Sequence, residues 1–108
     1  MSGFVLHPEA AKDIDEIWQY IAADNLNAAD RILEQIYEAI RSLVTFPHQG
    51  HRRADLTSKP LRFHSLRDYV IAYVPDKKPR AIIAVLHGRR NPHAIAAMLR
   101  GREGRIVL

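Results

Sequence analysis

Two amphipathic helical patterns, separated by a short polar break, fill the first half of the chain and constrain its fold most strongly. Apolar residues recur at spacings of three and four over 10–21, and a second stripe of the same kind runs over 29–44. Pro8 stands in the first turn of the first predicted helix, and Asn27 is predicted to cap the second. Because the connection is short, the helices must pair antiparallel and bury their stripes against further structure.

The hydrophobic period changes after Phe46-Pro47, where a polar loop extends to about residue 59. The segments beyond it are rich in β-branched and aromatic residues, and 75–79 is predicted to be a turn. The predicted strands are Phe4–Leu6, Leu61–His64, Tyr69–Val74 and Arg80–His87, followed by a short helix over 91–100.

This order, β-α-α-β-β-β, predicts an α+β domain. The N-terminal strand and the helical hairpin are expected to pack on one face of a twisted, mainly antiparallel sheet, and the other face is expected to carry the basic residues. We expect one domain over 1–108, in which 91–108 forms a short C-terminal helix and a basic tail.

The composition excludes several classes of protein. With 108 residues, 47% apolar and 26% charged, the chain is typical of a small globular domain. It contains no cysteine, which excludes disulfides, cysteine-based zinc sites and thiol catalysis. No segment approaches the roughly 20 apolar residues that span a bilayer. We therefore expect a cytoplasmic protein that does not bind membranes.

Charge is distributed unevenly along the chain. Residues 1–45 carry three basic and eight acidic residues, a net charge of −5, whereas 46–108 carry thirteen and four, a net charge of +9. Five of the six histidines also lie in the second part. This asymmetry predicts that an anionic partner approaches the second half.

The most distinctive local pattern is an apolar strand that runs directly into His87-Gly88-Arg89-Arg90. Arginine stays protonated, and its planar fork suits phosphate or carboxylate. The basic surface has three interpretations: a solvated surface, a nucleic-acid site, or a binding site for acidic protein segments, which is the favoured one. The candidate partner-binding residues are Arg62, His64, Arg67, His87, Arg89 and Arg90.

No catalytic residue is favoured from the sequence. If the protein cleaves RNA, His64 and His87 would be the acid–base pair, and Arg62, Arg67 and Arg89 would supply cations. The alternative is that a histidine at a strand end is a half-buried structural residue. His48 and His51 lie in a loop without acidic residues at ligand spacing, so we predict no metal and no cofactor.

Several segments, taken in order, resemble the RelE/ParE toxins of bacterial toxin–antitoxin systems. The resemblance covers about residues 4–92. It is carried by His7-Pro8-Glu9-Ala10-Ala11, by Asp13-Ile14-Asp15-Glu16-Ile17-Trp18-Gln19-Tyr20-Ile21, by Ala28 to Leu43 with Phe46-Pro47 and Gly50, by Tyr69-Val70-Ile71-Ala72-Tyr73, and by Val85-Leu86-His87-Gly88-Arg89-Arg90.

The resemblance implies a small toxin that is neutralised by a cognate antitoxin. RelE-type members cleave mRNA on the ribosome with clustered basic residues and a tyrosine, or with a Glu/His pair, whereas ParE-type members are thought to poison DNA gyrase. Here the last strand ends in His-Gly-Arg-Arg, and no tyrosine follows Tyr73. The chain therefore looks more like ParE, which implies gyrase as the target. The alternatives are a ribosome-dependent mRNA endonuclease and an inactive relative.

Overall fold

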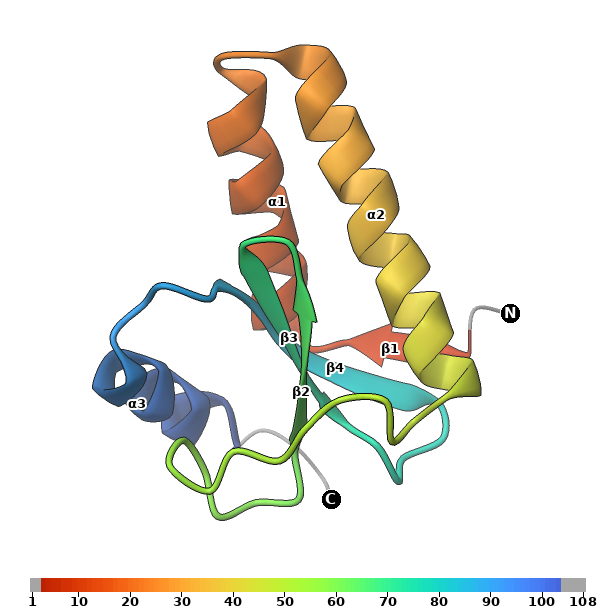
Figure 1. Ribbon diagram of the computed structural model, residues 1–108, viewed down its shortest axis with the longest axis vertical. Helices are drawn as coiled ribbons and strands as arrows, with labels where there is room; N and C mark the ends of the chain where they lie inside the picture. The colour runs from red at the N-terminus through yellow and green to blue at the C-terminus, as the bar shows by residue number, and fades with distance from the viewer. Residues whose placement is uncertain (1–2, 104–108) are drawn as a thin grey trace.

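The computed structural model describes residues 3–103 and shows three helices and a four-stranded sheet (Figure 1). In the sheet the order is β1-β4-β3-β2; β1 runs parallel to β4, and the other neighbours are antiparallel. The predicted α+β architecture is confirmed. The elements are β1 (Phe4–Leu6), α1 (Pro8–Ala22), α2 (Leu26–Thr45), β2 (Arg62–Leu66), β3 (Tyr69–Val74), β4 (Arg80–His87) and α3 (Pro92–Glu103).

Both long helices begin at side-chain caps. His7 Nδ1 accepts a hydrogen bond from the Glu9 amide at 3.0 Å, one residue before α1 begins. The predicted cap of α2 was wrong, because Asn25 rather than Asn27 accepts from the Ala28 amide at 3.0 Å. The helix therefore starts at Leu26, whose side chain is 57% exposed and so lies outside the apolar stripe that marked the helix in the sequence.

The helical hairpin packs on one face of the sheet, as predicted (Figure 1). The stripes of α1 and α2 bury their apolar side chains against the inner positions of β3 and β4. The fully or nearly fully buried members of this core are Ala10, Ile14, Ile36, Ile40, Leu43, Ile71, Tyr73, Ile82 and Val85.

The opposite face of the sheet is also an apolar core, and the prediction that it carries the basic residues was wrong. Nearly every residue of β3 and β4 is buried, because strands covered on both faces are continuously apolar. Helix α3 and Leu56 of the long loop cover this face. The core here comprises Leu56, Leu61, Phe63, Ala72, Val74, Ala81, Ile83, Ala84, Leu86, Ile95 and Leu99.

Helix α3 extends past its predicted end and is attached to α1 by a buried ion pair. It continues through Gly101 to Glu103, and residues 104–108 of the predicted basic tail lie outside the described part of the chain. Its Arg102 forms two hydrogen bonds with Asp13, at 2.7 and 2.9 Å, and the side chains are 8% and 12% exposed.

This ion pair also closes an open edge of β4. Strand β1 pairs with β4 only as far as Ile82, so the backbone beyond that point lacks a strand partner on this side. There the Val85 amide donates to Asp13 at 3.0 Å, and Arg102 donates to the Ile83 carbonyl at 3.1 Å. Among residues 3–103, no helix is long and apolar enough to span a membrane.

Candidate partner-binding site at the strand ends

Two turns meet at one end of the sheet and bring together four of the six predicted site residues. Tyr69 on β3 lies directly opposite His87 on β4, so the β2–β3 turn lies beside the end of β4. The Gly88 amide donates to the Asp68 carbonyl at 2.7 Å and fixes the two turns against each other. We call this group the strand-end site, and its predicted members are Arg67, His87, Arg89 and Arg90.

Arg67 occupies a strained backbone position in this site. It lies in a two-residue turn between the paired residues Leu66 and Tyr69, and its φ of +54° is in a region that side-chain-bearing residues rarely adopt. Its Nε donates to Oε1 of Gln35 on α2. The turn therefore directs this guanidinium toward the helical hairpin. Such strain concentrates at functional sites.

His87 has a structural role that orders the arginine pair. Its half-buried ring packs edge-on against Tyr69, with centroids 5.6 Å apart, and its Nδ1 accepts from the Arg89 amide at 3.2 Å. These contacts shape the turn that exposes Arg89 and Arg90. In the described part of the chain, no side chain holds either guanidinium. Both are free to bind a partner.

A cleft of about 370 Å³ lies between α1 and the strand ends. Its walls combine apolar side chains, two tyrosines and charges of both signs, a mixture that suits a protein segment better than a row of phosphates. It is lined by Asp13, Glu16, Ile17, Tyr20, Asp68, Tyr69, Val85, Leu86, His87 and Arg90.

The tyrosine beside His87 is a hydrogen-bonding group rather than a base. Burial raises the pKa of Tyr69 above its ordinary value, and the nearby Asp68 and Tyr20 raise it further. The hydroxyl therefore remains protonated near neutral pH. The cleft lacks the activated phenolate that a proton-transfer role for this residue would need.

Two of the predicted residues do not join the strand-end site. Arg62 pairs with Tyr73, whereas Leu66, four residues further along β2, pairs with Tyr69, so Arg62 lies about 13 Å along the strand from the strand-end site. His64 lies opposite Ile71, which in turn lies opposite Val85, so two strand spacings separate it from β4. The fully buried Ile71 lies between His64 and the strand that carries His87.

The structure therefore does not bring His64 and His87, the predicted acid–base pair, together. His87 lines the cleft and His64 does not. Burial lowers the pKa of His64, and the neighbouring His51 lowers it further, so its imidazole is neutral at pH 7. Within residues 3–103, no group of three or more ligating side chains is placed to hold a metal ion.

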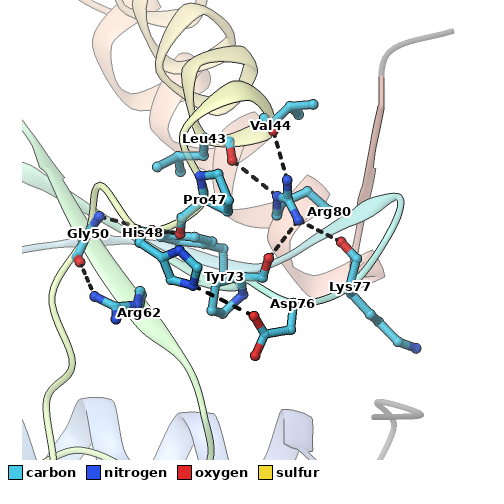
Figure 2. Close-up of polar contacts among 11 residues, drawn as sticks. Leu43, Val44, Pro47, His48, Gly50, Arg62, Tyr73, Asp76, Lys77 and Arg80 are labelled. Atoms are coloured by element: carbon cyan, nitrogen blue, oxygen red, sulfur yellow. Dashed lines mark hydrogen bonds and ion pairs between the residues drawn. The ribbon is translucent and has the colours of Figure 1, made fainter.

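At the opposite end of the sheet, Arg80 is used internally (Figure 2). Arg80, 5% exposed, donates to four carbonyls: Leu43 at 3.1 Å, Val44 at 2.7 Å, Pro75 at 2.6 Å and Lys77 at 2.9 Å. Two of these carbonyls belong to the last turn of α2, where the helix dipole also favours a cation. Arg80 is therefore a structural residue.

Sequence reasoning missed the residues of α1 that line the cleft. Asp13, Glu16 and Tyr20 were assigned to an ordinary amphipathic helix. One signal was present for Asp13, because it is a charged residue placed three after Ala10 and four before Ile17, on the buried stripe itself. No pattern in the sequence marks the other two.

The chain was also compared with known proteins. The family described as the ParE toxin of the type II toxin–antitoxin system parDE matches residues 4–92. This range includes the helical hairpin, all four strands and the arginine pair that follows β4. No curated protein matches the chain.

Proposed function

Because this chain belongs to the ParE toxin family of type II toxin–antitoxin systems, we propose that it inhibits DNA gyrase in the cytoplasm by binding rather than by catalysis. Its place in the family makes it a toxin component with an antitoxin as partner. What we propose beyond family membership is that DNA gyrase is the target.

One observation carries the proposal. Arg89 and Arg90 project from a turn that contacts of His87 and Gly88 hold in place, beside a cleft whose walls are partly apolar. Exposed arginines next to an apolar pocket are typical of protein-binding hot spots. The strand-end site presents such an arrangement, which supports binding of a protein target.

A gyrase supercoiling assay tests the proposal. The purified protein is expected to inhibit supercoiling of relaxed plasmid at a modest molar excess over gyrase. The variant Arg89→Ala/Arg90→Ala should need at least about tenfold more protein, since a hot-spot residue contributes more than about 1.4 kcal/mol. The matched control, Arg41→Ala/Arg100→Ala, removes two exposed arginines elsewhere and should inhibit like the wild type.

Three outcomes would contradict the proposal. Failure of the wild type to inhibit gyrase at large excess argues against the target. Ribosome-dependent cleavage of mRNA, detected by primer extension, would instead support the RelE-type alternative. Harmless overexpression in the absence of the antitoxin would identify an inactive relative.

We propose that the antitoxin approaches the basic half of the chain, residues 46–108, which also contains the strand-end arginines. The charge of +9 over residues 46–108 attracts an acidic segment, which accelerates association and fixes its orientation. Apolar anchors of the antitoxin would then supply the affinity. The candidate contacts remain Arg62, His64, Arg67, His87, Arg89 and Arg90, and the structure divides them between two ends of the sheet.

A further inference from the structure

A second hollow lies at the end of the sheet opposite the strand-end site. It has a volume of about 210 Å³ and lies between the loop that follows α2 and the β3–β4 connection. Unlike the cleft beside α1, it has no large apolar side chain in its wall. It is lined by His48, Arg52, Pro60, Arg62, Pro75 and Asp76.

One guanidinium of this hollow is held in place by a relay of hydrogen bonds (Figure 2). Arg62 donates to the Gly50 carbonyl at 2.8 Å, and the Gly50 amide donates to the Tyr73 hydroxyl at 2.9 Å. That hydroxyl donates in turn to the Pro47 carbonyl at 2.7 Å, and Tyr73 is fully buried. Because Arg62 is already ordered, binding a ligand costs less side-chain entropy.

Gly50 makes this arrangement possible. A Cβ at this position would lie 2.8 Å from the Phe63 carbonyl oxygen and 2.9 Å from the Tyr73 hydroxyl. The backbone at Gly50 can therefore approach β2 and Tyr73 closely only without a side chain. The guanidinium of Arg62 depends on this close approach for its position.

The two segments that supply the wall of the hollow are rich in basic residues. Residues 46–62 and 75–78 carry six basic and two acidic side chains, a net charge of +4, which equals the net charge of the whole chain. One cation is already engaged, because Arg53 pairs with Asp55 at 2.7 Å. Two other basic side chains of these segments, Arg52 and Arg62, line the hollow, and Lys59 and Lys78 lie in the same segments.

The carboxylate in the hollow faces an imidazole rather than the arginines. Asp76 Oδ1 lies 3.7 Å from Nε2 of His48, and both side chains are largely exposed. Solvent screens a carboxylate in such a position. The lining therefore carries two arginines against one carboxylate, and its net charge is positive.

We propose that this hollow binds a backbone phosphate of a nucleic-acid duplex, with Lys59 and Lys78 contacting neighbouring phosphates. Arginine forks match phosphate geometry, and a surface of spread cations without apolar anchors suits a regular array of phosphodiesters. An acidic peptide would need an apolar pocket for its affinity, which the wall of this hollow does not provide. The inference does not depend on gyrase inhibition.

Fluorescence anisotropy with labelled duplexes of arbitrary sequence tests the proposal. The wild type should bind duplex DNA or duplex RNA at low salt, with log Kobs falling linearly against log salt concentration. The variant Arg52→Ala/Arg62→Ala should bind at least about tenfold more weakly, and the magnitude of its salt slope should fall by about 0.9, since the hollow contacts one phosphate and each phosphate contact contributes about 0.9. Comparing the DNA and RNA arms identifies which duplex supplies the phosphate.

Controls separate a site from general charge. Arg41→Ala/Arg100→Ala removes the same charge elsewhere and should change the affinity less than about twofold. Arg52→Ala alone keeps the test valid if Arg62→Ala disturbs folding, because Arg52 is exposed. The proposal is overturned if the wild type binds neither duplex, if the control loses as much affinity as the double variant, or if polyglutamate displaces the duplex as effectively as unlabelled duplex does.

Discussion

Buried and exposed arginines in this small domain have opposite roles. Arg80 and Arg102 are 5% and 7% exposed, and their donors are taken up by carbonyls and by Asp13. Arg89 and Arg90 are exposed at the end of the same strand that Arg80 begins. All four contribute equally to the charge of the sequence. Their positions relative to the two cores decide whether they stabilise the fold or meet a partner.

The largest effect is expected from breaking the buried ion pair. Asp13→Ala leaves Arg102 buried without its counter-ion and frees the Val85 amide, which should lower the free energy of unfolding by about 4 kcal/mol. Urea denaturation followed by circular dichroism measures it. Asp24→Ala, which removes an exposed acid beyond α1, is the control. A loss below about 1 kcal/mol would show that the pair is not buried in solution.

A somewhat smaller loss is expected at the other buried arginine. Arg80→Met retains the aliphatic stem but leaves four carbonyls without their donor, which should cost about 3 kcal/mol. Arg80→Lys should recover part of this loss, because an ammonium group replaces some of the donors. Thermal unfolding of the three proteins gives the comparison. Equal melting temperatures for wild type and Arg80→Met would contradict the structural role.

Removing the Tyr73 hydroxyl tests the relay that positions Arg62. Tyr73→Phe leaves the Gly50 amide and the Pro47 carbonyl unpaired in a buried place, and should cost about 1.5 kcal/mol. Urea denaturation measures the loss. Tyr20→Phe is the matched control, since the Tyr20 side chain is 83% exposed and its change should be within about 0.5 kcal/mol. Similar effects of the two substitutions would argue against the relay.

The exposed arginine pair should show the reverse behaviour. Arg89→Ala/Arg90→Ala is expected to change the free energy of unfolding by less than about 0.5 kcal/mol, because neither guanidinium has a side-chain partner among residues 3–103. The same variant should lose growth arrest when expressed without the antitoxin. A large loss of stability would place these residues with Arg80 and remove the contrast between the two classes.

The smallest effect is a pH dependence from His64. Burial and His51 lower its pKa in the folded state below the ordinary value of 6.5. The unfolded chain therefore takes up a proton first, so this contribution to stability is complete above pH 6.5 and is lost as pH falls through the folded pKa. Urea midpoints at pH 7.5 and 5.5 should differ less in His64→Gln than in the wild type. If the difference between the two midpoints is the same in His64→Gln as in the wild type, His64 is not a source of the pH dependence.

Local patterns predicted the elements of the fold well. The stripes over 10–21 and 29–44 marked the helices because amphipathic spacing reflects burial, and the ends of β3 and β4 follow from their apolar runs. Asn25 was missed as the cap because Leu26 is exposed and breaks the stripe. The spacing of apolar residues indicates which side chains are buried, so it does not reveal a helical turn whose side chains are exposed.

The site was predicted only in part. Arg89 and Arg90 could be recognised as exposed site residues because they come just after the end of an apolar strand, beyond the residues that form the core. Sequence could not separate Arg62 from Arg67, because their distance depends on the register of β2 and on which end of the sheet each occupies. It also could not show that α3 covers the second face, since this depends on contacts far apart in the chain.

The pairing of Asp13 with Arg102 has a consequence for biosynthesis. The two residues are 89 positions apart, so at about 5–20 residues per second the ribosome adds the arginine roughly 4–18 s after the aspartate. Strand β1 likewise waits for β4 before it can join the sheet. During this interval the nascent chain can form its helical hairpin but not the ion pair between Asp13 and Arg102, so an antitoxin could bind the hairpin before the fold is closed.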